Sequence, residues 1–144
     1  MSELPPDPGP LVISCDGASR HNPGPAGIGA QITSVDGVVL AEVSEGIGIT
    51  TNNVAEYGAA IAGMEAALAL GAKKITLRSD SQLMIKQLLG AYRVKHPNLK
   101  PLHAQAGALL DRFDEATLQH VPRELNTEAD RLANLGVDTW LASN

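Results

Sequence analysis

The chain has very little cysteine, no long apolar run and no sign of a second domain. Cys15 is the single cysteine among 144 residues, which excludes an internal disulfide and indicates a reducing compartment. No apolar run approaches the roughly 20 residues that a membrane-spanning helix needs, and no signal-peptide pattern opens the chain. Length and a hydrophobic content of 44% indicate one globular domain, expected as a cytoplasmic monomer without a membrane partner.

Positive charge is scarce and unevenly placed. The formal net charge is −5, which taken alone argues against a polyanionic partner. Residues 71–100 nevertheless contain seven basic residues and one acid, a local charge of +6, and the remaining residues carry −11. This asymmetry suits a protein that binds phosphates in one place and holds cations with acids elsewhere. Charge alone leaves open the alternative of a solvated basic helix face.

The order of patterned segments predicts an α/β fold. Apolar, β-branched runs predict strands over residues 11–15, 28–33, 38–49, 74–78 and 117–121. Helical spacing and capping residues predict helices over about 52–70, 82–89, 98–113 and 126–136. Three antiparallel strands, a crossover helix and two parallel strands should form a five-stranded mixed sheet with helices on both faces.

Both ends of the chain are expected to lie outside that fold. Residues 1–10 contain four prolines and almost no large apolar side chain, so they are interpreted as a flexible tail. Residues 138–144 are weakly patterned and are interpreted as a C-terminal tail. The folded domain is therefore expected to span residues 11–137, and the loose ends permit the chain to be part of a longer polypeptide.

Four isolated acids fall at the ends of predicted elements. Asp16 and Asp80 are expected to end the first and fourth strands, and Glu56 and Asp130 to lie in the first turns of two helices. If those strands are parallel neighbours, the acids meet at the edge where α/β sheets bind ligands. Taken singly, each acid has an alternative role as a turn residue, a helix cap or a favourable charge at a helix N-terminus.

A cluster of ionised carboxylates is unstable unless a cation neutralises it, because like charges repel and raise one another's pKa. Oxygen-only ligands, without Cys or His, favour Mg²⁺ or Mn²⁺ over zinc. Two such ions roughly 3.5–4 Å apart would hold the attacking and leaving oxygens of a phosphodiester displacement in line. The pattern therefore predicts metal-assisted nuclease chemistry.

Four motifs in this order and spacing resemble type 1 ribonuclease H: Asp16–Gly24, Thr51–Glu56, Ser79–Gln82 and Asn126–Ala133. The resemblance covers residues 11 to about 136. It implies endonucleolytic cleavage of the RNA strand of an RNA/DNA hybrid, leaving 5′-phosphate and 3′-hydroxyl ends. It also implies that the four acids are catalytic and hold two Mg²⁺ ions, with Mn²⁺ as the alternative.

The resemblance further implies a set of substrate contacts. The matching residues for minor-groove contacts to the hybrid are Asn22, Asn52, Asn53 and Gln82, and Thr51 matches a contact to a DNA phosphate. Amide side chains suit this role because they pair with base edges and with the 2′-hydroxyl that distinguishes RNA from DNA. Helix capping is the alternative for the two adjacent asparagines.

The chain departs from the familiar bacterial pattern in two places. Only residues 90–97 stand where that form has a long basic helix, so affinity for the hybrid is expected to be lower or differently placed. Residues 122–126 replace a loop that carries a histidine, and Arg123 is the catalytic candidate there, with a surface salt bridge as the alternative. His120 is interpreted as an ordinary strand histidine.

The sequence leaves two other function classes open. One is a non-catalytic module that binds hybrid or double-stranded RNA, although clustered acids do not help a protein that only binds a polyanion. The other is a nuclease of the same fold that acts on DNA. The adjacent asparagines and Gln82 favour RNA, and activity on double-stranded RNA is left undecided.

Overall fold

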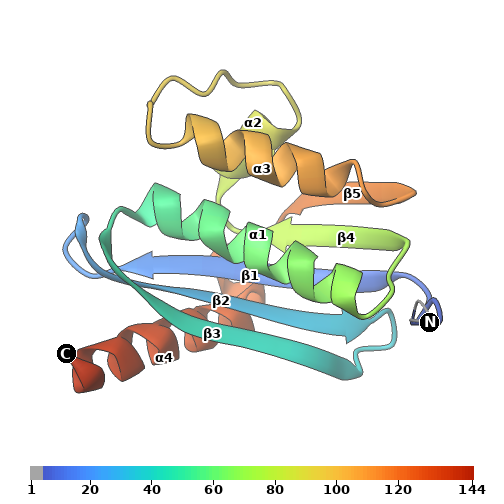
Figure 1. The fold of residues 1–144 in the computed structure, drawn as a ribbon, viewed down its shortest axis with the longest axis horizontal. Coiled ribbons are helices and arrows are strands. Elements are labelled where there is room, and N and C mark those ends of the chain that lie inside the picture. The colour runs from blue at the N-terminus through green and yellow to red at the C-terminus, as the bar shows by residue number, and fades with distance from the viewer. Residues whose placement is uncertain (1–4) are drawn as a thin grey trace, which may run out of the picture.

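The computed structural model describes residues 5–144 as one sheet with helices on its two faces (Figure 1). The strands are β1 (Leu11–Ser19), β2 (Gly24–Ser34), β3 (Val39–Thr50), β4 (Lys74–Ser79) and β5 (Glu115–His120). The helices are α1 (Asn52–Ala69), α2 (Gln82–Leu88), α3 (Lys100–Leu110) and α4 (Thr127–Ser143), with the short 3₁₀ helix η1 (Arg123–Leu125) before α4. The first four residues of the expected tail lie outside the described residues.

The sheet has the predicted mixed topology. Its strand order is β3-β2-β1-β4-β5, with antiparallel pairing of β2 to both β1 and β3 and parallel pairing of β4 to both β1 and β5. Leu11 lies opposite Ile75 and Cys15 opposite Ser79, so β1 and β4 point the same way. The carboxyl ends of these two central strands therefore lie side by side.

Small residues let a helix lie close to each face of the sheet. On one face, a Cβ at Gly63 of α1 would lie 2.6 Å from the side chain of Ile13. On the other face, a Cβ at Gly29 would lie 2.4 Å from the backbone of Ala129 and of Ala133 in α4. Since strand side chains alternate between faces, this arrangement confirms helices on both faces (Figure 1).

Several predicted element boundaries were wrong. β2 begins at Gly24 rather than at residue 28, and α3 ends at Leu110 rather than near residue 113. β1 does not end at Asp16, because β2 pairs with it as far as Ser19, whereas the pairing with β4 stops at Cys15. The last helix does not end at Gly136, because α4 continues to Ser143 and Trp140 packs against Gly46 of β3. Residues 138–143 thus belong to a helix rather than to the expected tail.

The core is formed by apolar side chains between the sheet and the helices. β1 contributes Leu11, Ile13 and Cys15, all essentially inaccessible to solvent, and β4 contributes Ile75 and Leu77. Cys15 is thus a buried strand residue, as predicted, and its burial raises the pKa of the thiol well above its usual value. None of the helices within residues 5–144 is long and apolar enough to cross a membrane.

Candidate metal and nucleic-acid site

The approach of α1 to the end of β1 depends on Gly17. A Cβ at this position would lie 2.2 Å from the backbone carbon of Ala55 and 2.3 Å from the nitrogen of Glu56. With glycine there, the Gly17 N–H donates to Oε2 of Glu56 at 3.2 Å. The Asp16-Gly17 pair therefore does two things: it supplies one carboxylate and lets the helix that carries a second one approach it.

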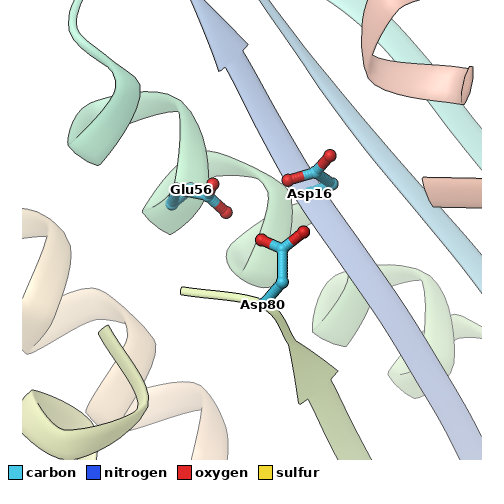
Figure 2. A group of neighbouring side chains, drawn as sticks. All are labelled: Asp16, Glu56 and Asp80. Carbon is cyan, nitrogen blue, oxygen red and sulfur yellow. The ribbon is translucent and has the colours of Figure 1, made fainter. Parts of the chain in front are cut away.

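Three carboxylates meet at this point, from β1, α1 and the residue that follows β4 (Figure 2). Asp16, Glu56 and Asp80 each offer an oxygen, and these oxygens all lie within 4.8 Å of one another. Asp16 is only 4% exposed, although it is an acid. The sequence predicts that four acids converge at one edge of the sheet, and the structure shows this convergence for these three.

The cluster is unfavourable in its charged form. Burial, together with the charges of Asp80 and Asp130, raises the pKa of Asp16 to about 8. Burial and the charges of Asp16 and Asp80 raise the pKa of Glu56 to about 9, partly offset by the hydrogen bond from Gly17. Without a counter-ion, these shifts favour the protonated forms of both groups, and a cation would replace the protons.

The donor atoms fit a hard divalent cation. The three convergent ligands are carboxylate oxygens, the preferred ligands of Mg²⁺ and Mn²⁺. Oδ2 of Asp80 is buried and has no hydrogen-bond partner among the described residues. Nor does Asp80 cap a helix, because Ser81 caps α2 and accepts from the Met84 N–H at 3.2 Å. Asp80 is thus free to bind a ligand.

Asp130 lies beside this cluster but outside the group of three. It occupies the first turn of α4 and is close enough to Asp16 to raise the pKa of that carboxyl. Its Oδ1 accepts from the side-chain amide of Asn134 at 3.3 Å. Arg20 donates in turn to Asn134 at 3.4 Å and pairs with Asp138 at 2.8 Å. A polar chain of contacts therefore connects Asp130 to the turn between β1 and β2.

The predicted amide residues connect the turn between β1 and β2 to the start of α1. The Asn22 side chain accepts from the Asn52 N–H at 3.0 Å, and the Asn52 side chain accepts from the Ser19 N–H at 2.8 Å. Thr51 caps α1 by accepting from the Val54 N–H at 3.2 Å. Thr51 therefore caps α1, whereas Asn22 and Asn52 hold the turn between β1 and β2 beside the carboxylates.

An open cavity of about 330 Å³ faces the carboxylates. Glu56 and Asp80 line it together with Asn53, Arg123 and His120. The sequence predicts an ordinary strand histidine at position 120, yet the parallel register pairs His120 with Ser79, next to Asp80. No local sequence pattern reveals this pairing. Gln82 is exposed at the first position of α2 and does not line this cavity.

A larger cavity, of about 540 Å³, lies beside the first and is bordered by the basic segment. Leu83 and Leu99 give it apolar walls, and residues 91–96 supply Tyr92, Arg93, Lys95 and His96. Asn53 lines both cavities. The positive region predicted from the sequence and the acidic cluster therefore border adjoining hollows that meet at Asn53.

Sequence comparisons agree with this geometry. Residues 14–136 match a family model described as reverse transcriptase-like. The chain is similar to ribonuclease HI of Halobacterium salinarum, with 50% identity over 123 residues, 85% of this chain and 62% of that protein. It is also similar to the bifunctional protein Rv2228c of Mycobacterium tuberculosis, with 49% identity over 129 residues, 89% of this chain. The chain spans only 35% of that mycobacterial relative.

Structural comparisons lead to the same group. The solved ribonuclease H1 of Halobacterium salinarum aligns with a TM-score of 0.88 and 47% identity, covering 91% of this chain and 99% of that one. LC11-RNase H1, solved in complex with an RNA/DNA hybrid, aligns with a TM-score of 0.86 and 40% identity over 91% of this chain and 99% of that one. Sequence, sheet topology and the position of the acids therefore point to one family.

Proposed function

The chain belongs to the ribonuclease H family, and from that premise we propose that it cleaves the RNA strand of RNA/DNA hybrids endonucleolytically. The products would carry 5′-phosphate and 3′-hydroxyl ends. The observation that carries this proposal is the meeting of Asp16, Glu56 and Asp80, with oxygens within 4.8 Å of one another. The hybrid bound to LC11-RNase H1 supports the choice of substrate.

In the proposed reaction, Asp16, Glu56, Asp80 and Asp130 hold two divalent ions, Mg²⁺ or Mn²⁺. Bound ions of this kind supply Lewis-acid activation of water and neutralise charge at the scissile phosphate. The chain contributes the positions of the ligands. The Gly17 N–H orients Glu56, and the end of the β1–β4 pairing places Asp16 next to the residue that follows β4.

Substrate recognition is assigned to the amides and to the basic segment. Asn22, Asn52, Asn53 and Gln82 would read the minor groove and the 2′-hydroxyls, which are the groups that distinguish RNA from DNA. Thr51 would contact a phosphate of the DNA strand. The basic residues of the segment 91–96 line the hollow that adjoins the acids, which supports a role in holding phosphates of the hybrid.

Arg123 is proposed as the residue that replaces the missing loop histidine. It is exposed, lines the cavity that faces the acids, and forms no ion pair within residues 5–144. All of the proposed groups come from one chain, which supports action as a monomer. The single buried cysteine supports a cytoplasmic setting.

The proposal is tested by incubating end-labelled hybrid, double-stranded RNA and DNA duplex with the protein, each with Mg²⁺ or Mn²⁺. We expect cleavage of the RNA strand of the hybrid and, after mapping, 5′-phosphate ends. Asp80→Asn should abolish cleavage and leave hybrid binding intact, because losing a metal ligand costs several kcal/mol of transition-state stabilisation. An uncut hybrid with both metals would support a binding module instead, and equal cleavage of DNA duplex would reverse the substrate assignment.

A further inference from the structure

A separate polar cavity lies on the α4 face of the sheet. Its volume is about 230 Å³, and it is bordered by β1, β2, Arg78 of β4 and the start of α4. Ser14 and Arg78 lie opposite one another in the parallel pair and also line this cavity. They precede Asp16 and Asp80 by two residues. The reaction proposed above makes no use of this cavity.

The guanidinium of Arg78 has no partner in the part of the chain that the structure describes. It forms no ion pair and no hydrogen bond there, and its Nε is buried and unsatisfied. Arg20 and Arg131, in contrast, are each paired with carboxylates. A buried donor without an acceptor is costly, so an anion in the cavity would supply the partner that Arg78 lacks.

The start of α4 adds further donors at the same cavity. Asn126 precedes α4 without capping it, and the first helical bond is from the Asp130 N–H to the Asn126 carbonyl at 3.1 Å. The N–H groups of Thr127, Glu128 and Ala129 therefore have no acceptor within residues 5–144, and these residues line the cavity. Free N–H groups and the helix dipole both favour an anion at this position.

The acids at the cavity do not cancel this positive character. Glu128 is the one acid among the lining residues, and its carboxylate is bound by Arg131 at 2.8 Å. The hydroxyl-bearing residues Ser14, Thr33 and Thr127 complete a polar lining. The cavity therefore combines one uncompensated positive charge with several neutral donors.

Asn126 narrows the choice of anion. It is only 2% exposed, and its Nδ2 donates to the Cys15 carbonyl at 2.9 Å. Its Oδ1 is buried and accepts no hydrogen bond from the described residues, and Asn126 lines the same cavity. The missing partner should therefore accept hydrogen bonds and also donate one. Sulfate and carboxylates at neutral pH have no proton to donate, and neither has the internal phosphodiester of a nucleic acid.

We propose that this cavity binds a monohydrogen phosphate group, which accepts from Arg78 and from the first N–H groups of α4 and donates its P–OH to Asn126 Oδ1. Free phosphate and the terminal phosphate monoester of a nucleotide share this chemistry. The bound group would contact β1, β4 and α4, the elements that carry or immediately precede three of the acids. The site stands on its own contacts and does not depend on the proposed nuclease activity.

The experiment is a titration of the full chain with inorganic phosphate at constant ionic strength and without divalent ions. The ¹⁵N–¹H resonance of Arg78 Nε is monitored during the titration. We expect a saturating shift of this resonance and weaker binding of sulfate. Arg78→Gln should weaken phosphate binding at least about tenfold, because charge-assisted hydrogen bonds are lost. Lys74→Gln is the matched control, since it removes one positive charge from the same strand outside the cavity lining, and it should bind as the wild type does.

Three results would overturn the proposal: an Arg78 resonance that phosphate does not move, equal phosphate binding by Arg78→Gln, or equal binding of sulfate. The wild-type resonance decides the first point even if Arg78→Gln folds poorly, and Arg78→Lys keeps the charge for a second comparison. A 5′-phosphorylated trinucleotide and its unphosphorylated form identify the source. Tighter binding of the phosphorylated trinucleotide than of free phosphate would identify strand ends as the ligand, and the reverse order would identify the free ion.

Discussion

The β1–β4 region has two halves with opposite effects on stability: the paired residues 11–15 and 75–79, and Asp16 and Asp80 directly beyond them. The first half packs Leu11, Ile13, Ile75 and Leu77 into the core, all of them buried. Burial of each such side chain lowers the free energy of the folded state by about 1.5–3 kcal/mol. The second half draws carboxylates together at the end of the same pairing, where burial and like charge disfavour their ionised forms.

The contrast indicates what each half is for. Apolar residues at the second half would make the sheet more stable, so the acids there are not explained by folding. They are explained by a ligand that neutralises them, and divalent cations match their oxygens. If this is correct, substitutions in the two halves should separate stability from cleavage.

The largest expected effect is on cleavage by Asp16→Asn. We expect hybrid cleavage to fall at least about 100-fold, equivalent to about 2.7 kcal/mol or more of transition-state stabilisation. The free energy of unfolding at pH 8 without metal should stay equal or increase, because one buried charge is removed. Single-turnover cleavage and urea denaturation measure the two quantities. A large loss of stability would show that Asp16 serves folding.

The converse substitution is Ile13→Ala in the first half. Removing this buried side chain should lower the free energy of unfolding by about 2–5 kcal/mol, because a cavity remains between β1 and α1. Urea denaturation gives the loss, and cleavage measured well below the unfolding transition should stay within about twofold of the wild type. A loss under about 1 kcal/mol would contradict the assignment of this half to the core.

The clustered acids should make the stability of the metal-free protein depend on pH. In the folded state the pKa of Asp16 is about 8 and that of Glu56 about 9, and both return to ordinary values near 4 on unfolding. The folded state thus holds more protons between pH 4 and 9, and stability should fall as the pH rises through this range. The expected slope is at most about 1.4 kcal/mol per pH unit for each proton.

Urea denaturation in EDTA at several pH values tests this slope. Asp16→Asn should have a flatter profile than the wild type, because one of the two groups no longer titrates and the other loses a charged neighbour. A wild-type profile that stays level from pH 5 to 9 would show that the clustered acids impose no cost on the folded state.

The smallest effect is expected for Arg123→Ala, at the rim of the second half. We expect a fewfold to about tenfold reduction in hybrid cleavage, since solvent and salt largely screen a single exposed positive charge, and no change in unfolding. Arg131→Ala is the matched control, because Arg131 is exposed, lies outside the cavity lining and pairs with Glu42 and Glu128. Equal effects of the two substitutions would remove Arg123 from the proposed reaction.

Much of this architecture could be predicted from the sequence because the signals are local. Asp16 and Asp80 each follow an apolar run, which predicts that both acids lie at the same edge of the sheet. The capping residue Thr51 predicts the start of α1. The end of β1 could not be predicted from a local pattern. Its length depends on pairing with β2, which holds the strand beyond the point where β4 stops.

Long-range contacts explain the other differences. α4 extends to Ser143 because Gly46 of β3 leaves space for Trp140, a contact that no local pattern reveals. The sequence predicts an ordinary strand histidine at position 120, because the neighbour of His120 across the sheet, Ser79, is distant in sequence and its proximity to the acids is not visible locally. The link from Asp138 through Arg20 to Asn134 and Asp130 likewise joins distant segments.

The most direct test of the central claim is the effect of Mg²⁺ on unfolding at pH 8. A ligand at 100 times its Kd stabilises the folded state by about 2.7 kcal/mol, and we expect a saturable increase of this order for the wild type. The double variant Asp16→Asn, Asp80→Asn should show almost no increase, because the cluster has lost two ligands. Equal stabilisation of both proteins would show that Mg²⁺ binds elsewhere and would contradict the account.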